Sequence, residues 1–457
     1  MRSPDRKPRE LLARLAEQPG GARLLALAGP ETYLVGGAVR DLMLGRVPRE
    51  LDVVVEGEDA ARALVAELAA AAAGGAGDGA VGPRPVEHPR FGTARVELPG
   101  GARVDVAQAR RERYPAPGAL PEVEPARLEE DLLRRDFTVN TLALALAPNA
   151  AGGALRAAAH ALQDLREGRL RVLHERSFID DPTRLWRLAR YRARLDFAIE
   201  ERTAQLAHAA VAAGALATVS GARVGAELRL ALAEPDALAA LAELERLGVL
   251  RALHPRLRLD HEVVERALEL LAGGRAVAVQ DAGAPGAGDR PDLLMLAGIA
   301  LPLALSGVLG GDTAACTAAD GDARSEIAAF LDRLEFTAAD RDRVVSAAAA
   351  VPGLIDELPG AVRASQLREV AVRVPPEGVA LAGALSVPAA TPARRWLCEL
   401  RHVRLSIGGK DLLAAGVPEG PELGRRLERA LRMRLDGALA DGPEAELAVA
   451  LEDPLGA

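Results

Sequence analysis

One short segment constrains the fold of this chain more than any other. Residues 33–57 read YLVGGAVRDLMLGRVPRELDVVVEG. An apolar strand runs into Gly36 and Gly37, a helical stretch follows to about residue 44, and a second strand covers 51–55. Glycines at a strand-to-helix turn let backbone N–H groups approach a phosphate, and the helix N-terminus favours its negative charge. The segment therefore predicts an α/β domain with a phosphate-binding turn.

Three charged side chains accompany this turn. Arg40 lies one helical turn beyond the glycines, where its guanidinium can donate to the same phosphate. Glu50 and Asp52 stand two residues apart at the start of the second strand, so their carboxylates point to one face of it. Mg²⁺ is normally bound by one or two carboxylates together with substrate phosphates. The combination predicts a triphosphate–metal site, although each part alone is compatible with an ordinary glycine turn and two solvent-facing acids.

The complete segment resembles a known signature. Its strings GGAVRDLMLG and ELD are similar to the class II nucleotidyltransferase pattern of the DNA polymerase β superfamily, which CCA-adding enzymes and bacterial poly(A) polymerases share. That pattern is GGxVRDxxLG followed by Asp-x-Asp, and Glu50 replaces its first aspartate here. The resemblance implies that Gly36, Gly37 and Arg40 bind a nucleoside triphosphate. It also implies that Glu50 and Asp52 are catalytic and hold Mg²⁺.

A third carboxylate follows on a later strand-like run, residues 103–108. Asp105 lies between two valines, which would face the opposite side of the strand. A carboxylate that projects from a strand beside the metal strand is what a third acidic ligand or a general base requires. With the resemblance, Asp105 is expected to assist the attack of a hydroxyl group. The alternative is an ordinary solvent-facing strand residue.

The stretch RRDFTVN, residues 134–140, resembles the family's second motif. In that motif an arginine contacts the triphosphate, and an aspartate and an asparagine organise the ribose side. The resemblance implies that Arg135 binds phosphate and that Asp136 and Asn140 lie near the sugar hydroxyls. A carboxylate–amide pair suits a 2′-hydroxyl, which both donates and accepts hydrogen bonds. The alternative is a helix with two solvated arginines.

The stretch SFIDDPTRLWRLARYRARLDF, residues 177–197, predicts a capped helix. Asp181 fits the N-cap and Pro182 the first helical position. Three arginines then follow at spacings of three and share one helical face, Arg184, Arg187 and Arg190.

This stretch also resembles the family's nucleotide-selecting motif, Glu-Asp-x-x-Arg, with Asp180 in place of the glutamate. The resemblance implies that Asp181 and Arg184 present acceptors and donors to the edge of C or A, as a protein template. Arg187 and Arg190 would lie behind them in the nucleotide site. For Asp181 a plain helix cap is the alternative, and one residue can serve both purposes.

The string GGKDLLAAGVPEGPELGRRLERALRMRLDGAL, residues 408–439, resembles the tail segment of CCA-adding and related enzymes. Its last predicted helix has a basic side suited to RNA phosphates. The arginines on that side are Arg425, Arg426, Arg429 and Arg432. A solvated arginine face is the alternative.

Composition narrows the remaining possibilities. The 457 residues, 49% of them hydrophobic and 27% charged, are expected to form a globular protein of two to four domains. Two cysteines give neither a disulfide framework nor a zinc site. An aromatic content of 2% excludes extensive base-stacking platforms. Since neither an apolar run of membrane-spanning length nor a signal peptide is visible, the chain is expected to be cytoplasmic, with no membrane association.

The order of patterns gives a predicted architecture. Residues 8–28 read as one amphipathic helix, and the chain looks helical throughout after residue 154. The predicted fold class is an α/β nucleotidyltransferase head with a DNA polymerase β-like mixed sheet, followed by an all-α neck, body and tail. The predicted domains are a catalytic head 1–155, a neck 156–245 with the nucleotide-selecting motif, a body 246–370 and a tRNA-binding tail 371–457.

Together, the residues and the resemblance imply a CCA tRNA nucleotidyltransferase. It would add C, C and A to the tRNA 3′ end without a template, using CTP, ATP and two Mg²⁺ ions and releasing pyrophosphate. Its expected partner is the tRNA acceptor end, with no obligate protein partner evident. A CC-adding or A-adding tRNA nucleotidyltransferase or a poly(A) polymerase is the alternative, since these enzymes share the motifs. A non-catalytic RNA-binding relative is a further alternative, should Glu50 be unable to replace aspartate.

Overall fold

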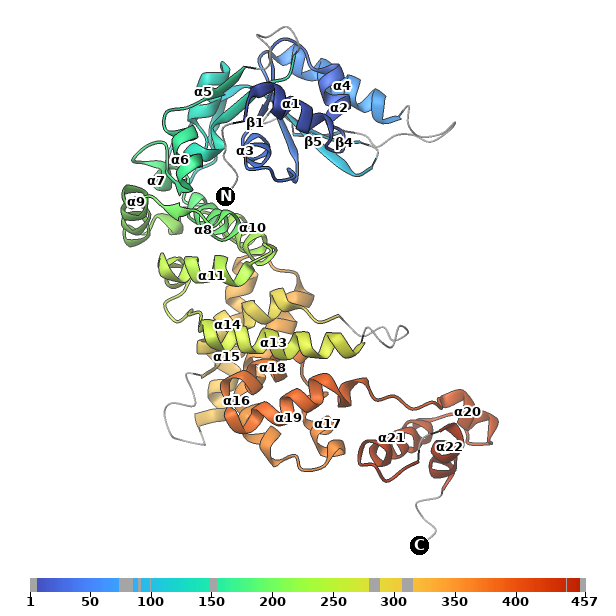
Figure 1. The fold of residues 1–457 in the computed structure, drawn as a ribbon. Helices are drawn as coiled ribbons and strands as arrows, with labels where there is room; N and C mark the ends of the chain where they lie inside the picture. The colour runs from blue at the N-terminus through green and yellow to red at the C-terminus, as the bar shows by residue number, and fades with distance from the viewer. Residues whose placement is uncertain are drawn as a thin grey trace. The chain divides into compact units, whose positions relative to one another are not determined.

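The computed structural model describes residues 6–73, 85–88, 92–98, 100–147, 154–278, 288–305, 315–440 and 442–452. The chain divides into two compact units. The first comprises Met1–Ser220 with Arg246–Val249, and the second comprises Gly221–Glu245 with Leu250–Ala457. Within the described ranges, all strands belong to the first unit and the second unit is helical (Figure 1).

A seven-stranded mixed sheet forms the centre of the first unit. Its strand order is β3-β4-β5-β2-β1-β8-β9, in which β2 and β5 run parallel and the other neighbours run antiparallel. The strands are β1 (Thr32–Val35), β2 (Leu51–Val55), β3 (Val86–His88), β4 (Thr93–Leu98), β5 (Ala102–Gln108), β8 (Leu142–Ala145) and β9 (Leu155–Ala157). Two smaller two-stranded sheets are β6 (Arg110–Arg113) with β7 (Glu122–Pro125), and β10 (Arg169–Leu170) with β11 (Ala198–Ile199).

Helices of the first unit cover the sheet and continue beyond it. They are α1 (Pro8–Ala16), α2 (Gly21–Leu27), α3 (Gly37–Met43), α4 (Glu58–Ala73), α5 (Leu128–Leu133), α6 (Ala161–Glu167), α7 (Ser177–Asp180), α8 (Arg184–Leu195) and α9 (Glu201–Ala212), with short 3₁₀ turns η2 (Thr138–Asn140) and η3 (Ala215–Thr218).

Alternating residues give β4 and β5 two different faces. Val96, Val104 and Val106 are buried, and α4 packs against these two strands. Successive side chains of a strand point to opposite faces. Arg95 and Asp105, which alternate with the valines, therefore project from the other face of the sheet.

On this other face, α5 covers part of β1 and β2. Leu128 and Leu132 of α5 belong to one buried cluster with Tyr33 and Val54 of these strands. Asp52 lies two residues before Val54 and shares its face of β2. Since α5 ends at Leu133, the motif residues that follow it are delivered to the side of the sheet that carries Asp52.

The second unit is a helical array with a separate small core near the C-terminus. Its helices are α10 (Gly221–Leu232), α11 (Ala237–Arg246), α12 (Val249–Leu253), α13 (His261–Ala278), α14 (Pro291–Leu305), α15 (Ala315–Arg333), α16 (Ala338–Gly360), α17 (Ala364–Ala371), α18 (Pro376–Leu385), α19 (Val387–Cys398), α20 (Gly409–Ala414), α21 (Pro421–Leu435) and α22 (Pro443–Leu451), with the 3₁₀ turn η5 (Leu400–His402). The apolar helix α14 is buried along most of its length and packs against α13, α16 and α18. Leu412, Val417, Ala430 and Val449 form the small core of α20–α22.

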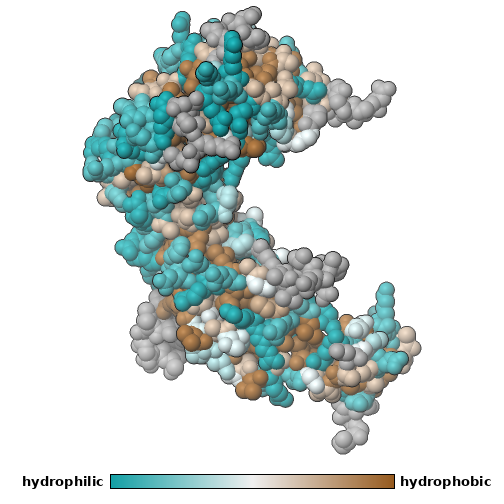
Figure 2. Space-filling model, viewed as in Figure 1, coloured by the Kyte–Doolittle hydropathy of each residue, from teal (hydrophilic) through white to brown (hydrophobic). Residues whose placement is uncertain are grey.

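Surface composition is mixed on both units. On the face seen in Figure 2, hydrophobic residues lie in patches interrupted by hydrophilic ones. Among the helices that the structure describes, none combines the length and the hydrophobicity needed to cross a membrane.

The predicted fold class, a mixed-sheet head followed by helices, is confirmed. Two local predictions were wrong. Residues 8–28 form two helices, α1 and α2, because Gly20 interrupts them with a φ of 75°. The chain after residue 154 is also not wholly helical, since β9, β10 and β11 follow that point. The four-part division at 155, 245 and 370 stays a prediction.

Candidate nucleotide and metal site

Strand register assembles a row of charged side chains across three neighbouring strands. Asp52 of β2 pairs with Asp105 of β5, and Asp105 pairs with Arg95 of β4. Directly paired residues point to the same face of a sheet. Glu50 precedes Asp52 by two residues and joins the row from the start of β2. Three carboxylates and one guanidinium therefore gather on the face opposite α4.

The three carboxylates are close enough to share a cation. Glu50, Asp52 and Asp105 each offer an oxygen atom, and these oxygens all lie within 4.8 Å of one another. Carboxylate oxygens are the ligands that Mg²⁺ and other hard divalent ions prefer. The donor set thus fits the predicted metal, and the third carboxylate expected from the sequence lies beside the predicted pair.

The surroundings of Asp52 disfavour its charged form. Burial raises the pKa of Asp52 to about 6, the negative charges of Asp105 and Glu50 add to the shift, and the Arg135 guanidinium opposes it. A carboxylate whose charged form is disfavoured in this way gains most from a bound cation. The row therefore carries an excess of negative charge that a divalent ion would neutralise.

Arg95 compensates part of this charge. Its Nε and Nη2 atoms each donate to one oxygen of Asp105 at 2.7 Å, and Nη2 lies 3.8 Å from Glu50 Oε1. This residue lies outside the motifs that predicted the site. A usable signal existed, since Arg95 and Asp105 are equally far from Gly100 in the turn between two strands, which predicts a cross-strand pair.

The glycine turn lies against Arg135. Gly36 has a φ of 68°, which glycine adopts without strain, and a Cβ placed there would lie 2.8 Å from Nη1 of Arg135. Arg135 also donates to the buried Asp131 at 2.8 Å. Among the residues that the structure describes, its buried Nε has no hydrogen-bond partner. A positive group therefore lies beside the turn and also interacts with the charge of Asp52, which favours binding of an anionic ligand here.

Gly37 and Arg40, predicted to bind the triphosphate, contact each other and other protein groups. A Cβ on Gly37 would lie 3.3 Å from Nη2 of Arg40, so this glycine makes room for the guanidinium. Arg40 is only 2% exposed and donates to Asn140 at 2.6 Å and to Asp41 at 2.9 Å. It therefore links the helix after the turn to the second motif through protein contacts, and direct phosphate binding by Arg40 stays a prediction.

Asp136 and Asn140 lie at the centre of a network of hydrogen bonds between protein side chains. Asn140 and Arg187 donate to the two oxygens of Asp136 at 2.9 and 2.7 Å. Burial alone would raise the pKa of Asp136, but Arg187 and the Asn140 hydrogen bond lower it to about 2. The two predicted ribose-side residues are thus brought together, with their polar atoms engaged by protein groups.

The segment predicted to select the nucleotide differs from its predicted structure in detail. Helix α8 begins at Arg184, so a start at Pro182 was wrong by two residues, a usual uncertainty at helix ends. The Asp181 carboxylate accepts from the backbone N–H and the hydroxyl of Thr183 at 3.2 and 2.7 Å, which gives it a capping role in the turn before α8. Arg184 is 4% exposed and donates to Ser177 Oγ and the Arg134 carbonyl, both at 2.7 Å.

Tyr191 joins several of these arginines and was also missed. The guanidiniums of Arg40, Arg187 and Arg194 lie 5.5, 5.5 and 5.7 Å from the centre of its ring. Such contacts are attractive because the ring face is electron-rich. Arg190, one residue earlier on α8, is half-buried. The face of α8 that carries Arg187 is therefore tied to α3 through one aromatic ring.

The arginines of α21 are engaged within the second unit. Arg425 donates to Glu422, and Arg432 pairs with Glu369 at 2.7 Å. Arg426 and Arg429 donate to backbone carbonyls at the C-terminus of α22, where cationic groups are stabilising. The last two therefore hold α22 in place, and RNA binding by the four arginines stays a prediction.

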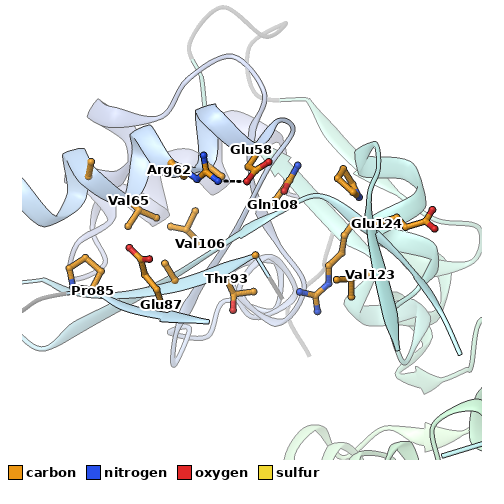
Figure 3. A pocket seen from close by; sticks show the side chains of 16 residues that line it. Glu58, Arg62, Val65, Pro85, Glu87, Thr93, Val106, Gln108, Val123 and Glu124 are labelled. Carbon is orange, nitrogen blue, oxygen red and sulfur yellow. Dashed lines mark hydrogen bonds and ion pairs between the residues drawn. The ribbon is translucent and has the colours of Figure 1, made fainter. Parts of the chain in front are cut away.

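A pocket of about 620 Å³ lies elsewhere on the head. Its lining includes Val106 and Gln108 of β5 and the ion-paired Glu58 and Arg62 of α4 (Figure 3). Because Val106 and Gln108 alternate with Asp105, the pocket opens on the opposite face of the sheet. It is therefore separate from the carboxylate row.

The family comparisons agree with this geometry. Residues 32–171 match the poly(A) polymerase head domain, and residues 196–259 match a domain described as a probable RNA and SrmB-binding site of polymerase A. An A-adding tRNA nucleotidyltransferase from Geobacter sulfurreducens is 34% identical over 434 residues, which cover 92% of this chain and 45% of the relative. A CC-adding tRNA nucleotidyltransferase from Deinococcus radiodurans is 43% identical over 211 residues, covering 46% of this chain and 52% of the relative. The chain thus spans about half the length of these curated relatives.

A solved structure matches over nearly its full length. The Thermotoga maritima CCA-adding enzyme complexed with tRNA has a TM-score of 0.70 and 27% identity, and the match covers 97% of this chain and 98% of that one. Residues 32–171, which hold the carboxylate row, thus match a nucleotidyltransferase head domain, and the chain as a whole is similar to class II nucleotidyltransferases such as tRNA nucleotidyltransferases.

Proposed function

We propose that this protein is a tRNA nucleotidyltransferase that adds C, C and A to the tRNA 3′ end from CTP and ATP and releases pyrophosphate. The observation that carries the proposal is the convergence of Glu50, Asp52 and Asp105 within 4.8 Å on one face of the sheet. The nearby Gly36 turn and Arg135 support a triphosphate site beside them. The solved relative with bound tRNA supports tRNA as the substrate.

The proposed chemistry is attack of the RNA 3′-hydroxyl on the α-phosphate, with pyrophosphate as the leaving group. Glu50, Asp52 and Asp105 would hold two divalent ions, and such ions supply electrostatic stabilisation of the attacking and leaving oxygens. Asp105 assists removal of the hydroxyl proton. Arg135 would orient the triphosphate through its positive charge beside the turn, and Gly36 leaves room for that guanidinium.

Base selection is proposed for the start of α8. Asp181 and Arg184 would read the edge of C or A, while Arg187 and Arg190 support them. Arg184 now donates to Ser177 and to the Arg134 carbonyl. Reading a base therefore requires Arg184 to exchange at least one of these hydrogen bonds for one to the nucleotide.

An A-adding activity is the second candidate. The relative that matches 92% of this chain is named as an A-adding enzyme, and this favours an enzyme that completes a tRNA already ending in CC. A CC-adding activity is the complementary case, since one matched relative bears that name.

Three tRNA substrates distinguish these candidates. One lacks CCA, one ends in C and one ends in CC, and each is incubated with CTP, with ATP and with both. A CCA-adding enzyme completes all three when both nucleotides are present. An A-adding enzyme extends only the tRNA ending in CC, with ATP alone. A CC-adding enzyme stops at CC even when ATP is supplied, and no incorporation into any tRNA contradicts the proposed enzyme.

A further inference from the structure

Arg95 holds the third carboxylate of the row. Both oxygens of Asp105 accept from this guanidinium at 2.7 Å, in the forked geometry that makes Arg–carboxylate pairs strong. The same Nη2 atom lies 3.8 Å from Glu50. Arg95 is 43% exposed, so its side chain has solvent to move into.

A metal ion and this guanidinium would compete for Asp105. An ion bound by the three carboxylates needs an oxygen of Asp105, and both of those oxygens already accept from Arg95. A divalent ion beside a guanidinium also experiences repulsion between like charges, which is strong at contact distance. Occupation of Asp105 by one cation therefore disfavours the other.

Substrate phosphates change this balance. Mg²⁺ normally combines one or two carboxylates with phosphate oxygens, so an ion that arrives with a triphosphate brings further ligands. A metal–triphosphate complex can therefore displace the Arg95 guanidinium from Asp105. A bare ion lacks the phosphate ligands and competes with the guanidinium less well.

We propose that Arg95 is a positioning residue that acts as a built-in counter-ion. It orients Asp105 in the metal-free site and weakens binding of bare divalent ions. The inference rests on the proposed function and adds a residue that regulates metal entry to it.

The same two strands provide a matched control. Arg103 of β5 is paired in register with Glu97 of β4, at a distance of 3.5 Å between Nε and Oε1. Both side chains of this pair are more than half exposed. An Arg103→Gln variant thus loses a cross-strand ion pair of the same hairpin without touching the three carboxylates.

The test is titration of the intact protein with Mn²⁺ alone at pH 8, followed by the paramagnetic signal of free Mn²⁺. Arg95→Gln is expected to lower the Kd for Mn²⁺ about tenfold, because one positive charge leaves the site. Arg103→Gln should stay within about twofold of the parent. In EDTA, Arg95→Gln should have a lower Tm than the parent, and saturating Mn²⁺ should close that gap.

Each outcome decides between the alternatives. An unchanged or higher Kd in Arg95→Gln contradicts the counter-ion role, since a purely structural pair would give that result. Absence of Mn²⁺ binding from both the parent and Arg95→Gln contradicts the proposed metal site itself and not Arg95 alone. If Arg95→Gln does not fold, Arg95→Lys replaces it, because lysine keeps the charge but loses the fork. A decrease in Kd of about threefold is then expected, which is roughly half of the tenfold effect on a logarithmic scale. An unchanged Kd in Arg95→Lys would overturn the inference.

Discussion

Two aspartates of the first unit, Asp52 and Asp136, have opposite surroundings. Asp52 is half-buried beside two further carboxylates, and its pKa is raised to about 6. Asp136 is buried between Asn140 and Arg187, and its pKa is lowered to about 2. The protein compensates the charge of Asp136 with its own hydrogen bonds and ion pair, but compensates that of Asp52 only in part, through Arg135. A bound cation would therefore stabilise the charged form of Asp52, whereas the charge of Asp136 is already stabilised within the protein.

The largest expected effect is that of Asp52→Ala on catalysis. Loss of a central metal ligand should lower the rate of nucleotide addition by at least about 10³-fold, with tRNA affinity nearly unchanged. Incorporation of labelled nucleotide and a tRNA binding assay measure the two quantities. Glu97→Gln, on the same sheet, is the control and should retain the parental rate. A rate within tenfold of the parent for Asp52→Ala would refute the site.

Replacement of Asp52 and of Asp136 by asparagine should have different effects on the free energy of unfolding. Asp136→Asn leaves the Arg187 guanidinium without its carboxylate and should lower the free energy of unfolding by about 3 kcal/mol. Asp52→Asn relieves repulsion and should leave the metal-free protein as stable as the parent or more stable. Denaturant unfolding in EDTA measures both. Equal losses from the two substitutions would remove the distinction between the aspartates.

The raised pKa of Asp52 predicts a pH dependence in the absence of metal. The folded-state pKa of about 6 exceeds the unfolded value of 3.8, so the folded protein binds more protons in this interval. The contribution of Asp52 to stability should therefore fall as pH rises from 4 to 6.5, by about 2 kcal/mol. Comparison of the parent with Asp52→Asn in EDTA isolates this contribution. A difference between them that does not vary with pH would contradict the assigned shift.

Glu50 tests whether the whole row carries the metal. Glu50→Gln should lower activity about tenfold and be partly rescued by Mn²⁺, because one charged ligand is lost while its shape is kept. Glu50→Asp, which matches the family pattern, should remain active. Full activity of Glu50→Gln would mean that Asp52 and Asp105 suffice and that Glu50 is a strand-edge acid.

The smallest expected effect concerns Asp181. If this residue selects the base, Asp181→Ala should raise incorporation of UTP or GTP relative to CTP, since a hydrogen-bonding site discriminates by leaving polar groups unpaired. Loss of its contacts to Thr183 should cost about 1 kcal/mol of stability or less. The nucleotide ratio and the Tm are measured on the same variant. A lower Tm with an unchanged ratio would leave Asp181 as a cap only.

Local patterns predicted most of the carboxylate row. Strand β2 has its expected bounds, Leu51–Val55, because an apolar run between a proline-containing loop and a glycine is a strong strand pattern. Alternation along the strands placed Asp52 and Asp105 on the faces they occupy. These inferences needed only neighbouring residues and the period of a strand.

The hydrogen-bond partners of the other motif residues are distant in sequence and could not be predicted. Asn140 lies 100 residues from Arg40, and Arg187 lies 51 residues from Asp136, so no local pattern could reveal that these groups satisfy one another. The arginines of α21 face the same difficulty, because the carbonyls that occupy Arg426 and Arg429 belong to another helix. An arginine in a motif indicates a positive charge, whereas its availability to a ligand depends on the fold.

The hydrogen bonds of Asp136 also affect the order in which parts of the chain can fold during synthesis. During synthesis, residues 1–155 include every strand of the sheet except β9, yet Arg187 and Tyr191 are still missing. A head that ends at that point would lack both the guanidinium that pairs with Asp136 and the Phe137–Val172 bridge beside it, so the second motif would lose contacts that stabilise it. The sheet therefore reaches its final stability only when α8 has emerged from the ribosome, and a fragment intended to isolate the head should extend through Leu195.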